Sequence, residues 1–316
     1  MSTSTRTALG PPVLQEIEDG LYAYVQPDGS WWINNTGLLV GPHAAVGVDA
    51  CATEARTRAW REAVRGVTDR PVRTLVNTHH HGDHTHGNSL FRDATIVAHE
   101  GTRRALIEAG LWRDPPFWTP FDLGYVELEP PSLTYRDGVT LWVGDLEVEV
   151  RHVGRPAHTT NDSIVWVPDR SVLYSGDLLF AGGTPFLLMG SVVGAVRVLE
   201  DVLAPLGART IVPGHGPVCG PAVIDDVLGY LHFVLEVAAR GQAAGLSPLQ
   251  AARETDLGPY AQWLDSERIV GNLHRAYAEA APPADGGVPE GGPIDLAAAL
   301  GDMVTYNGGQ PLTCLA

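Results

Sequence analysis

Short apolar runs alternate with polar turns over the first two thirds of the chain, and the last third changes to helical spacing. An apolar run bounded by glycine, proline, asparagine or aspartate is typical of a β-strand. This pattern predicts strands at residues 20–25, 32–40, 44–48, 71–76, 95–98, 140–143, 146–150, 163–167, 172–175 and 210–212.

Apolar positions at helical spacing are clearest at 223–244. Further helices are predicted at 53–66, 100–109, 195–206, 248–280 with a break at 257–259, and 294–303. Strands recur in runs rather than in strict alternation with helices, which favours a layered α+β sandwich with two sheets. Residues 1–12 are expected to form a frayed tail, 13–280 one catalytic domain, 281–293 a Pro/Gly linker, and 294–316 a terminal helix and tail.

The composition describes a folded, acidic protein. Of its 316 residues, 44% are hydrophobic and 18% charged, which is enough apolar material for a sizeable core. Lysine and arginine number 21 against 37 aspartates and glutamates, for a net charge of -16. This balance argues against nucleic acid or an anionic membrane as partner. Arg103, Arg104 and Arg113 form one local basic spot.

Three scattered cysteines, Cys51, Cys219 and Cys314, lack any C-x-x-C spacing. The sequence therefore suggests neither a disulfide framework nor a thiolate zinc site. It also lacks a signal-like apolar segment and any long apolar run, so we expect a cytoplasmic protein.

Residues 77–88 read NTHHHGDHTHGN and follow the predicted strand 71–76. In an extended segment, residues two apart face the same side, so His79 and His81 can hold one metal ion. Gly82 lets the chain turn, and Asp83 and His84 can then point at a second ion. Burying four such groups without a cation would be costly. The alternative interpretation is a polar, histidine-rich surface loop.

Three more candidate ligands lie next to later predicted strands: His158 in GRPAHTTND, Asp177 in LYSGDLLF and His215 in IVPGHGPV. Strand ends of a layered fold meet at one rim, so these residues can join the first four. One ion would take His79, His81 and His158, the other would take Asp83, His84 and His215, and Asp177 would bridge them. Each ion keeps a position for a shared water, as a catalytic site requires. Two Zn²⁺ suit these ligands, although iron or manganese would accept them too.

Four polar residues fall outside this set. Asp49, which ends the strand 44–48, would either orient a metal ligand from behind or cap the turn before the helix at 53. His80, His86 and His99 are expected behind the ligands or at the surface.

The motifs HHHGDH, AHTTND, SGD and PGHGP, within residues 14–220, resemble those of the metallo-β-lactamase superfamily. The resemblance implies a four-layer αββα sandwich, with two mixed β-sheets flanked by helices and a dimetal site at one edge. A cysteine at 177 would point to zinc β-lactamases, and a glutamate at 81 to diiron reductases. Asp177 and His81 instead resemble the thioesterase and lactonase branches.

A longer resemblance includes INNTGLLVG, ELEPPSLTYRDGVTLWVG, TPFLLMGSVVG and the ending YNGGQPLTCLA. These segments are similar to the cyclase/thioesterases of bacterial aromatic (type II) polyketide pathways. The resemblance implies an aromatic polyketide intermediate as substrate, carried as a thioester on an acyl carrier protein. An aldol condensation and dehydration would close a ring, and hydrolysis would release the product. Asp83 would bind metal and also steer a proton of the activated water.

Other functions are compatible with the same ligands. The first is a plain hydrolase, such as a glyoxalase-type thioesterase or a lactonase. The second is an oxygenase of the persulfide type with one iron. The third is a binding protein without catalysis, against which the complete ligand set argues.

Three aromatic or apolar segments are expected to form the substrate pocket. They are the loop 110–125, the stretch FAGGTPFLLM at 180–189, and the pair at 31–32, which could act as a flap. Ordinary core packing is the alternative for the first two, and a hairpin with one exposed tryptophan for the third. The expected pocket residues are Trp31, Trp32, Trp112, Phe117, Trp118, Phe180, Phe186, Leu187 and Met189.

Overall fold

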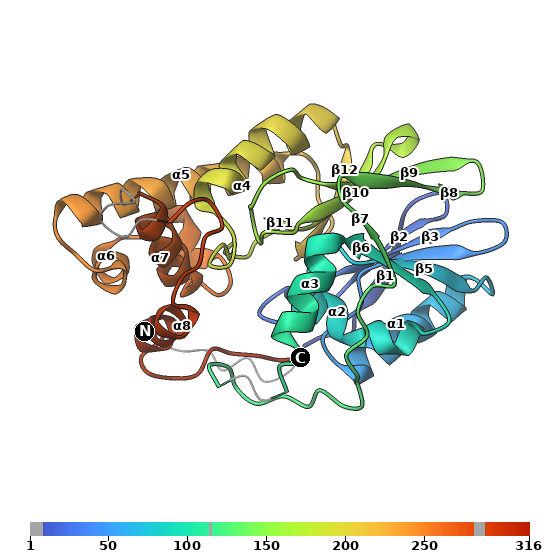
Figure 1. Cartoon of the computed structure of the whole chain (residues 1–316), viewed down its shortest axis with the longest axis horizontal. Coiled ribbons are helices and arrows are strands. Elements are labelled where there is room, and N and C mark those ends of the chain that lie inside the picture. Colours follow the sequence, from blue (N-terminus) through green and yellow to red (C-terminus); the bar gives the residue numbers. More distant parts are fainter. Residues whose placement is uncertain (1–8, 114–115, 281–287) are drawn as a thin grey trace.

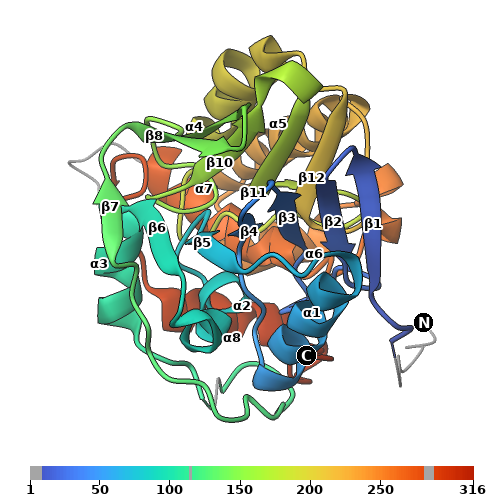
Figure 2. The same cartoon turned by 90° about the vertical axis from the view of Figure 1, so that its right-hand side faces the viewer.

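The computed structural model describes residues 9–113, 116–280 and 288–316. Two β-sheets lie face to face, and helices cover the outer face of each (Figure 1 and Figure 2). The structure thus confirms the predicted four-layer α+β sandwich with two mixed sheets. The expected tail and most of the Pro/Gly linker, residues 1–8 and 281–287, lie outside the described residues.

The first sheet has seven strands in chain order. They are β1 (Val13–Glu18), β2 (Leu21–Val25), β3 (Thr36–Val40), β4 (Ala45–Val48), β5 (Val72–Val76), β6 (Thr95–His99) and β7 (Leu133–Tyr135). Pairing is antiparallel from β1 to β4 and parallel from β4 to β7. The carboxyl ends of β4, β5 and β6 therefore meet at one edge of this sheet.

The second sheet has five strands in the order β12-β11-β10-β9-β8. Their bounds are β8 (Gly138–Val143), β9 (Leu146–His152), β10 (Ser163–Val167), β11 (Val172–Phe180) and β12 (Thr210–His215). Only β11 and β12 pair in parallel. The aligned carboxyl ends of these two strands bring Asp177 and His215 to the same rim.

The described helices follow the predicted order. They are α1 (Glu54–Val67), α2 (Gly82–Thr85), α3 (Glu100–Ala109), α4 (Val192–Val198), α5 (Ala222–Ala243), α6 (Pro248–Glu254), α7 (Arg268–Ala280) and α8 (Leu296–Tyr306). Short helical turns are η1 (His86–Phe91), η2 (Pro168–Arg170), η3 (Leu199–Leu203), η4 (Ala204–Leu206) and η5 (Gly258–Gln262). None of the described helices has both the length and the apolar character needed to cross a bilayer.

Strand β10 shows why the second sheet has an apolar core on each of its two faces. Val165 and Val167 pack in the core between the two sheets, whereas Ile164 and Trp166 belong to the core that also contains residues of α4, α5 and α7. Alternate side chains of a strand point to opposite faces, so a strand buried on both faces is a continuous apolar run. Trp60 of α1 packs in a third core against the outer face of the first sheet.

Two predictions on strand limits were wrong. The strand expected at 32–40 begins only at Thr36, because Asn34 and Asn35 donate side-chain hydrogen bonds to Ala50 O at 2.7 Å and Pro213 O at 2.9 Å. These bonds tie residues 34–35 to the rim instead of to a neighbouring strand. Asp177 lies inside β11 rather than beyond it, where the register with β12 shifts after Gly176.

Candidate metal centre

Seven side chains from separate elements converge at the rim where the two sheets meet. His79 and His81 follow β5, Asp83 and His84 belong to α2, His158 lies between β9 and β10, Asp177 is in β11, and His215 ends β12. They form two groups that share Asp177, and within each group the possible ligand atoms lie within 4.8 Å of one another. The structure thus brings together every residue expected to bind metal.

The first group contains three histidines. His158 Nε2 lies 2.9 Å from His81 Nδ1 and 3.3 Å from Asp177 Oδ2. His79 Nε2 is 3.9 Å from the same Asp177 oxygen. Three imidazole nitrogens and one carboxylate oxygen around one point are a donor set that Zn²⁺ accepts.

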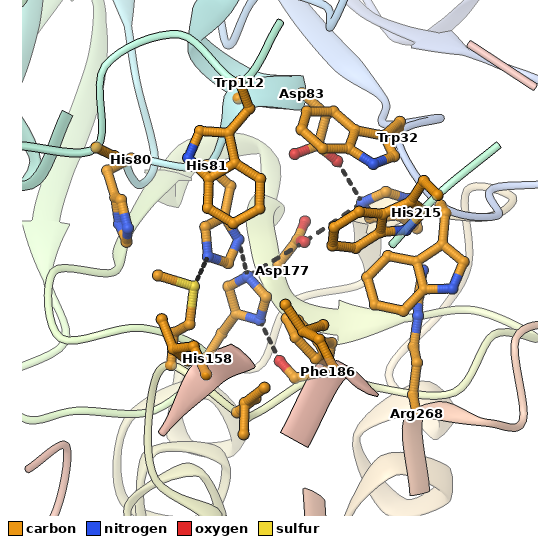
Figure 3. A pocket seen from close by; sticks show the side chains of 18 of the residues that line it. Trp32, His80, His81, Asp83, Trp112, His158, Asp177, Phe186, His215 and Arg268 are labelled. Carbon is orange, nitrogen blue, oxygen red and sulfur yellow. Dashed lines mark hydrogen bonds and ion pairs between the residues drawn. The ribbon is translucent and has the colours of Figure 1, made fainter. Parts of the chain in front are cut away.

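The second group contains two histidines and a second carboxylate. His215 Nε2 lies 3.3 Å from Oδ2 of both Asp83 and Asp177. His84 Nε2 lies 3.0 Å from Asp177 Oδ1. Asp177 thus faces both groups at once, which is the position that a bridging ligand needs (Figure 3).

Each of the five histidines uses its second ring nitrogen for a contact outside the cluster. The partners are Thr78 Oγ1 for His79, Met189 Sδ for His81, Asp49 Oδ2 for His84, Phe186 O for His158 and Gly29 O for His215. A carbonyl or carboxylate oxygen only accepts, so Nδ1 of His84, His158 and His215 carries the proton. Nε2 of each points into the cluster, where it can bind a metal ion after giving up any proton that the neighbouring carboxylates hold there.

The buried, inward-facing atoms fit a pair of divalent cations. His79 Nε2 has no hydrogen-bond partner among the described residues, although its side chain is 1% exposed. A buried polar atom without a partner is costly, and a bound ion would remove that cost. The donor set, nitrogen and carboxylate oxygen without sulfur, suits zinc and also iron or manganese.

Asp49 supports two of these histidines and does not cap a helix. Its carboxylate accepts from His84 Nδ1 at 2.9 Å, and from the backbone N–H and hydroxyl of Thr78, both at 2.8 Å. Helix α1 is capped by Thr53 instead. Because Thr78 Oγ1 also contacts His79 Nδ1 at 3.0 Å, Asp49 reaches one histidine of each group.

Burial and neighbouring charge set the protonation of the cluster. Burial lowers the pKa of His79 and His81 well below the usual histidine value, so both rings are neutral. Burial acts in the same direction on His215, but the Asp177 and Asp83 carboxylates outweigh it and raise its pKa to about 9. Burial would raise the pKa of Asp177, yet His215 and His84 hold it well below the usual range.

Comparison with known proteins identifies the family. The model of the metallo-β-lactamase superfamily matches residues 29–215, which include all seven candidate ligands. The chain belongs to this superfamily.

Relatives within the superfamily have several activities. The human acyl-coenzyme A thioesterase MBLAC2 is 27% identical over 49% of this chain, a match that spans only 60% of that protein. A hydroxyacylglutathione hydrolase of Brucella anthropi is 26% identical over 74% of this chain and 83% of its own length. The metallo-β-lactamase from Pontibacter korlensis has the same fold, with a TM-score of 0.59, 17% identity, and coverage of 70% of this chain and 99% of its own.

A cavity with about 810 Å³ of empty space, part of it open to solvent, lies against the candidate metal ligands. Seven of the expected pocket residues line it: Trp31, Trp32, Trp112, Trp118, Phe180, Phe186 and Met189. Leu188, which belongs to the expected stretch 180–189, also lines it, as do Arg268, Leu296 and Leu300, which were not expected. Helices α7 and α8, beyond the family match, therefore form one wall.

Two expected pocket residues face elsewhere. Leu187 points away from its neighbours Phe186 and Leu188, into a smaller apolar cavity beneath His158. Phe117 packs on the helical core, while its backbone carbonyl accepts from Leu312 N–H at 2.8 Å. The next residue, Trp118, turns toward the cavity instead.

Trp31 and Trp32 are both buried, with 6% and 8% of their surfaces exposed, so the hairpin with one exposed tryptophan was wrong. Trp31 Nε1 donates to Glu267 Oε1 at 2.7 Å, and the Arg268 guanidinium lies 3.9 Å from the centre of the Trp31 ring. These contacts connect the segment before β3 to the start of α7.

The three histidines that were expected outside the ligand set do lie outside it. His80 is buried and its Nδ1 contacts the side chain of Asn161. His86 packs against the ring of Trp32, with the ring centres 5.8 Å apart. His99 accepts from Gly101 N–H at the start of α3 and stacks on His152.

Proposed function

We propose that this protein is a dinuclear, metal-dependent cyclase/thioesterase. Its substrate would be a partly cyclised aromatic poly-β-ketone, carried as a thioester on an acyl carrier protein. The observation that carries the proposal is the aromatic cavity that opens directly onto two metal-binding groups.

The shape and chemistry of the cavity favour a flat, largely apolar substrate. Four tryptophans and two phenylalanines line it. Trp118 is the centre of the cluster, because its ring meets those of Trp31 and Trp32 edge to face, with centres 5.3 and 5.8 Å away. Aromatic walls of this kind stack against fused rings and hold them in one plane.

Two divalent cations held by the seven ligands would polarise carbonyl oxygens and make water a nucleophile at neutral pH. The aromatic walls hold the chain bent, so that the carbon between two carbonyls meets a ketone carbon. The first carbon loses a proton and forms a C–C bond to the ketone carbon, the ketone oxygen takes a proton, and loss of water completes the ring. In the hydrolysis, water adds to the thioester carbon, the C–S bond breaks, and acid and free thiol leave.

Asp83 is our candidate for moving the proton in both reactions. Its carboxylate lines the cavity beside Trp32, whereas Asp177, the other carboxylate of the lining, faces both metal-binding groups (Figure 3). Burial would raise the pKa of Asp83, but His84 and His215 outweigh it and hold the carboxyl ionised. An ionised carboxylate at the cavity wall can accept a proton from the substrate or from water.

A plain thioester hydrolase is the second candidate. The human and Brucella relatives named above, an acyl-coenzyme A thioesterase and a hydroxyacylglutathione hydrolase, favour it. Both candidates share the C–S cleavage and differ in whether a ring closes first.

One assay separates the two candidates. The purified protein, loaded with zinc, is given the N-acetylcysteamine thioester of a bicyclic aromatic β-ketoacyl chain, and in parallel a hydroxyacylglutathione. We expect ring-closed, released acid from the first and little turnover of the second. Hydrolysis of both without ring closure would replace the proposal with the plain hydrolase. Elemental analysis must give two ions per chain; a single iron would favour an oxygenase.

A further inference from the structure

Helix α7 presents three buried polar side chains to the backbone of the cavity-lining segment 184–188. Arg268 donates to Thr184 O at 2.8 Å, Asn272 donates to Pro185 O at 2.8 Å, and Arg275 donates twice to Leu188 O, at 3.0 and 2.7 Å. All three are at most 1% exposed. Positions 268, 272 and 275 lie on one face of a helix, so α7 holds this segment along its whole length.

One peptide group of this segment has a partner on each side. Its carbonyl, Phe186 O, accepts from His158 Nδ1 at 2.6 Å (Figure 3). Its amide, Leu187 N–H, donates to Asn272 Oδ1 at 2.8 Å. The peptide group is planar and rigid, so a side chain that fixes the amide also fixes the direction of the carbonyl.

The hydrogen-bond partners of Asn272 fix the orientation of its side-chain amide. Its Nδ2 donates to Pro185 O and contacts the Tyr230 hydroxyl at 3.0 Å, which leaves Oδ1 for Leu187 N–H. On the far side, Gly190 lets the same segment approach the His158 loop closely. A Cβ at that position would lie 1.9 Å from Ala157 O.

We infer that Asn272 is a positioning residue for His158, acting through the peptide group between Phe186 and Leu187. The carbonyl keeps the His158 proton on Nδ1 and aims Nε2 at His81 and Asp177. Asn272 thereby tunes the three-histidine group from outside the segment that matches the superfamily. The inference rests on the metal centre that underlies the proposed function.

Replacing Asn272 should affect the two metal-binding groups unequally. This difference distinguishes a role in positioning His158 from general support of the fold. Removing a group that orients a metal ligand typically lowers affinity by about 10- to 100-fold. Asn272 acts one peptide group away, so we expect about a 10-fold loss for Asn272→Leu. The loss should fall on the ion held by His79, His81 and His158, whereas the group containing His84 and His215 keeps its affinity.

The experiment titrates metal-free protein with Co²⁺ and follows both binding events by visible absorption. His81→Ala and His215→Ala show which event belongs to which group. Asn272→Asp should retain affinity within about threefold, because burial favours the neutral carboxyl group, whose carbonyl oxygen accepts from Leu187 N–H and whose O–H donates to Pro185 O. Gln242→Leu is the control, since the Gln242 side chain donates to Tyr277 O in the same helical region and not to the segment 184–188. Nitrogen-15 spectra of the metal-free protein report whether His158 keeps its proton on Nδ1.

The outcomes are distinct. Selective weakening of the three-histidine event in Asn272→Leu, with rescue by Asn272→Asp, supports the inference. Equal weakening of both events, or unchanged affinity and an unchanged His158 spectrum, overturns it. If Asn272→Leu does not fold, Asn272→Ser replaces it, because the serine hydroxyl stops short of Leu187 N. A wild-type protein that binds no metal would refute the centre and with it the effect of Asn272 on metal affinity, and the nitrogen-15 spectra would then show separately whether Asn272 orients His158.

Discussion

Replacing Asp49 with asparagine should weaken both metal-binding groups, because Asp49 supports a histidine in each. Oδ2 accepts from His84 Nδ1 and from Thr78 Oγ1, and Oδ1 accepts from Thr78 N–H. All three partners are donors. An asparagine side chain has one oxygen and one NH₂, so either orientation places the NH₂ against at least one of these donors.

The expected loss follows from this mismatch. Asp49 is 2% exposed, so water cannot supply the missing acceptor. Losing an orienting partner of a ligand costs about 10- to 100-fold in metal affinity, or about 1.4 to 2.7 kcal/mol. We expect this loss for the ion bound by His84 directly. A smaller loss is expected for the ion bound by His79, because Thr78 Oγ1 lies between Asp49 and that ring.

The assay is competition for Zn²⁺ with a chromophoric chelator, which resolves both affinities. Glu279→Gln is the matched control: this carboxylate also accepts two hydrogen bonds, from Ser191 and from Gly291, but neither partner touches a metal ligand. We expect the control to bind zinc like the wild type. Unchanged affinities for both ions in Asp49→Asn would refute the reasoning. A loss as large in Glu279→Gln would show that general destabilisation is the cause.

Three further predictions concern other parts of the molecule. Trp31→Ala should raise the ratio of prematurely released to ring-closed product several-fold, because the cavity no longer holds the chain bent. Chromatography of the products measures this ratio, and an unchanged ratio would contradict the prediction. Gly214→Ala should leave fewer than two ions per chain by elemental analysis, since a Cβ there would lie 1.9 Å from Asp177 Oδ1, and full occupancy would be the contrary result. Burial lowers the pKa of His152 to about 4, so between pH 6.5 and 4 the unfolded chain binds a proton that the native one does not. The free energy of unfolding of the metal-free protein should therefore fall as the pH falls through this range. Denaturant titrations at several pH values should show a weaker dependence of this free energy on pH for His152→Leu than for the wild type.

The sequence predicted most of the fold and the whole candidate ligand set. The H-x-H-x-D-H spacing is local, so four ligands could be found without knowing the topology. His158, Asp177 and His215 could be found because each lies beside an apolar run in a glycine- or proline-rich motif. The role of Asp49 remained ambiguous, because its hydrogen-bond partner His84 lies 35 residues further along the sequence and only folding brings the two side chains together.

The cavity was harder to predict. Leu187 and Phe117 were expected to face the substrate, but in irregular segments no period tells which neighbour points inward. Arg268, Leu296 and Leu300 were missed because they reach the cavity through the packing of distant helices. A signal was present in RIVGNLHR, where polar residues 268, 272 and 275 interrupt the apolar face of an amphipathic helix. Buried polar residues at that spacing indicate a partner with unpaired backbone groups.

The hydrogen bond between Trp31 and Glu267 joins residues that are 236 positions apart in the sequence. The metal centre and its cavity are therefore completed at different times during synthesis of the chain. A ribosome delivers every candidate ligand by residue 215, before it makes the helix that faces Trp31. The emerging chain can therefore gather its metal-binding side chains while the surrounding tryptophans are still uncovered. Contacts between such distant segments form late and slowly. Until they form, the aromatic surface is open to association with other chains, so completion of α7 and α8 protects the nascent protein as well as shaping its cavity.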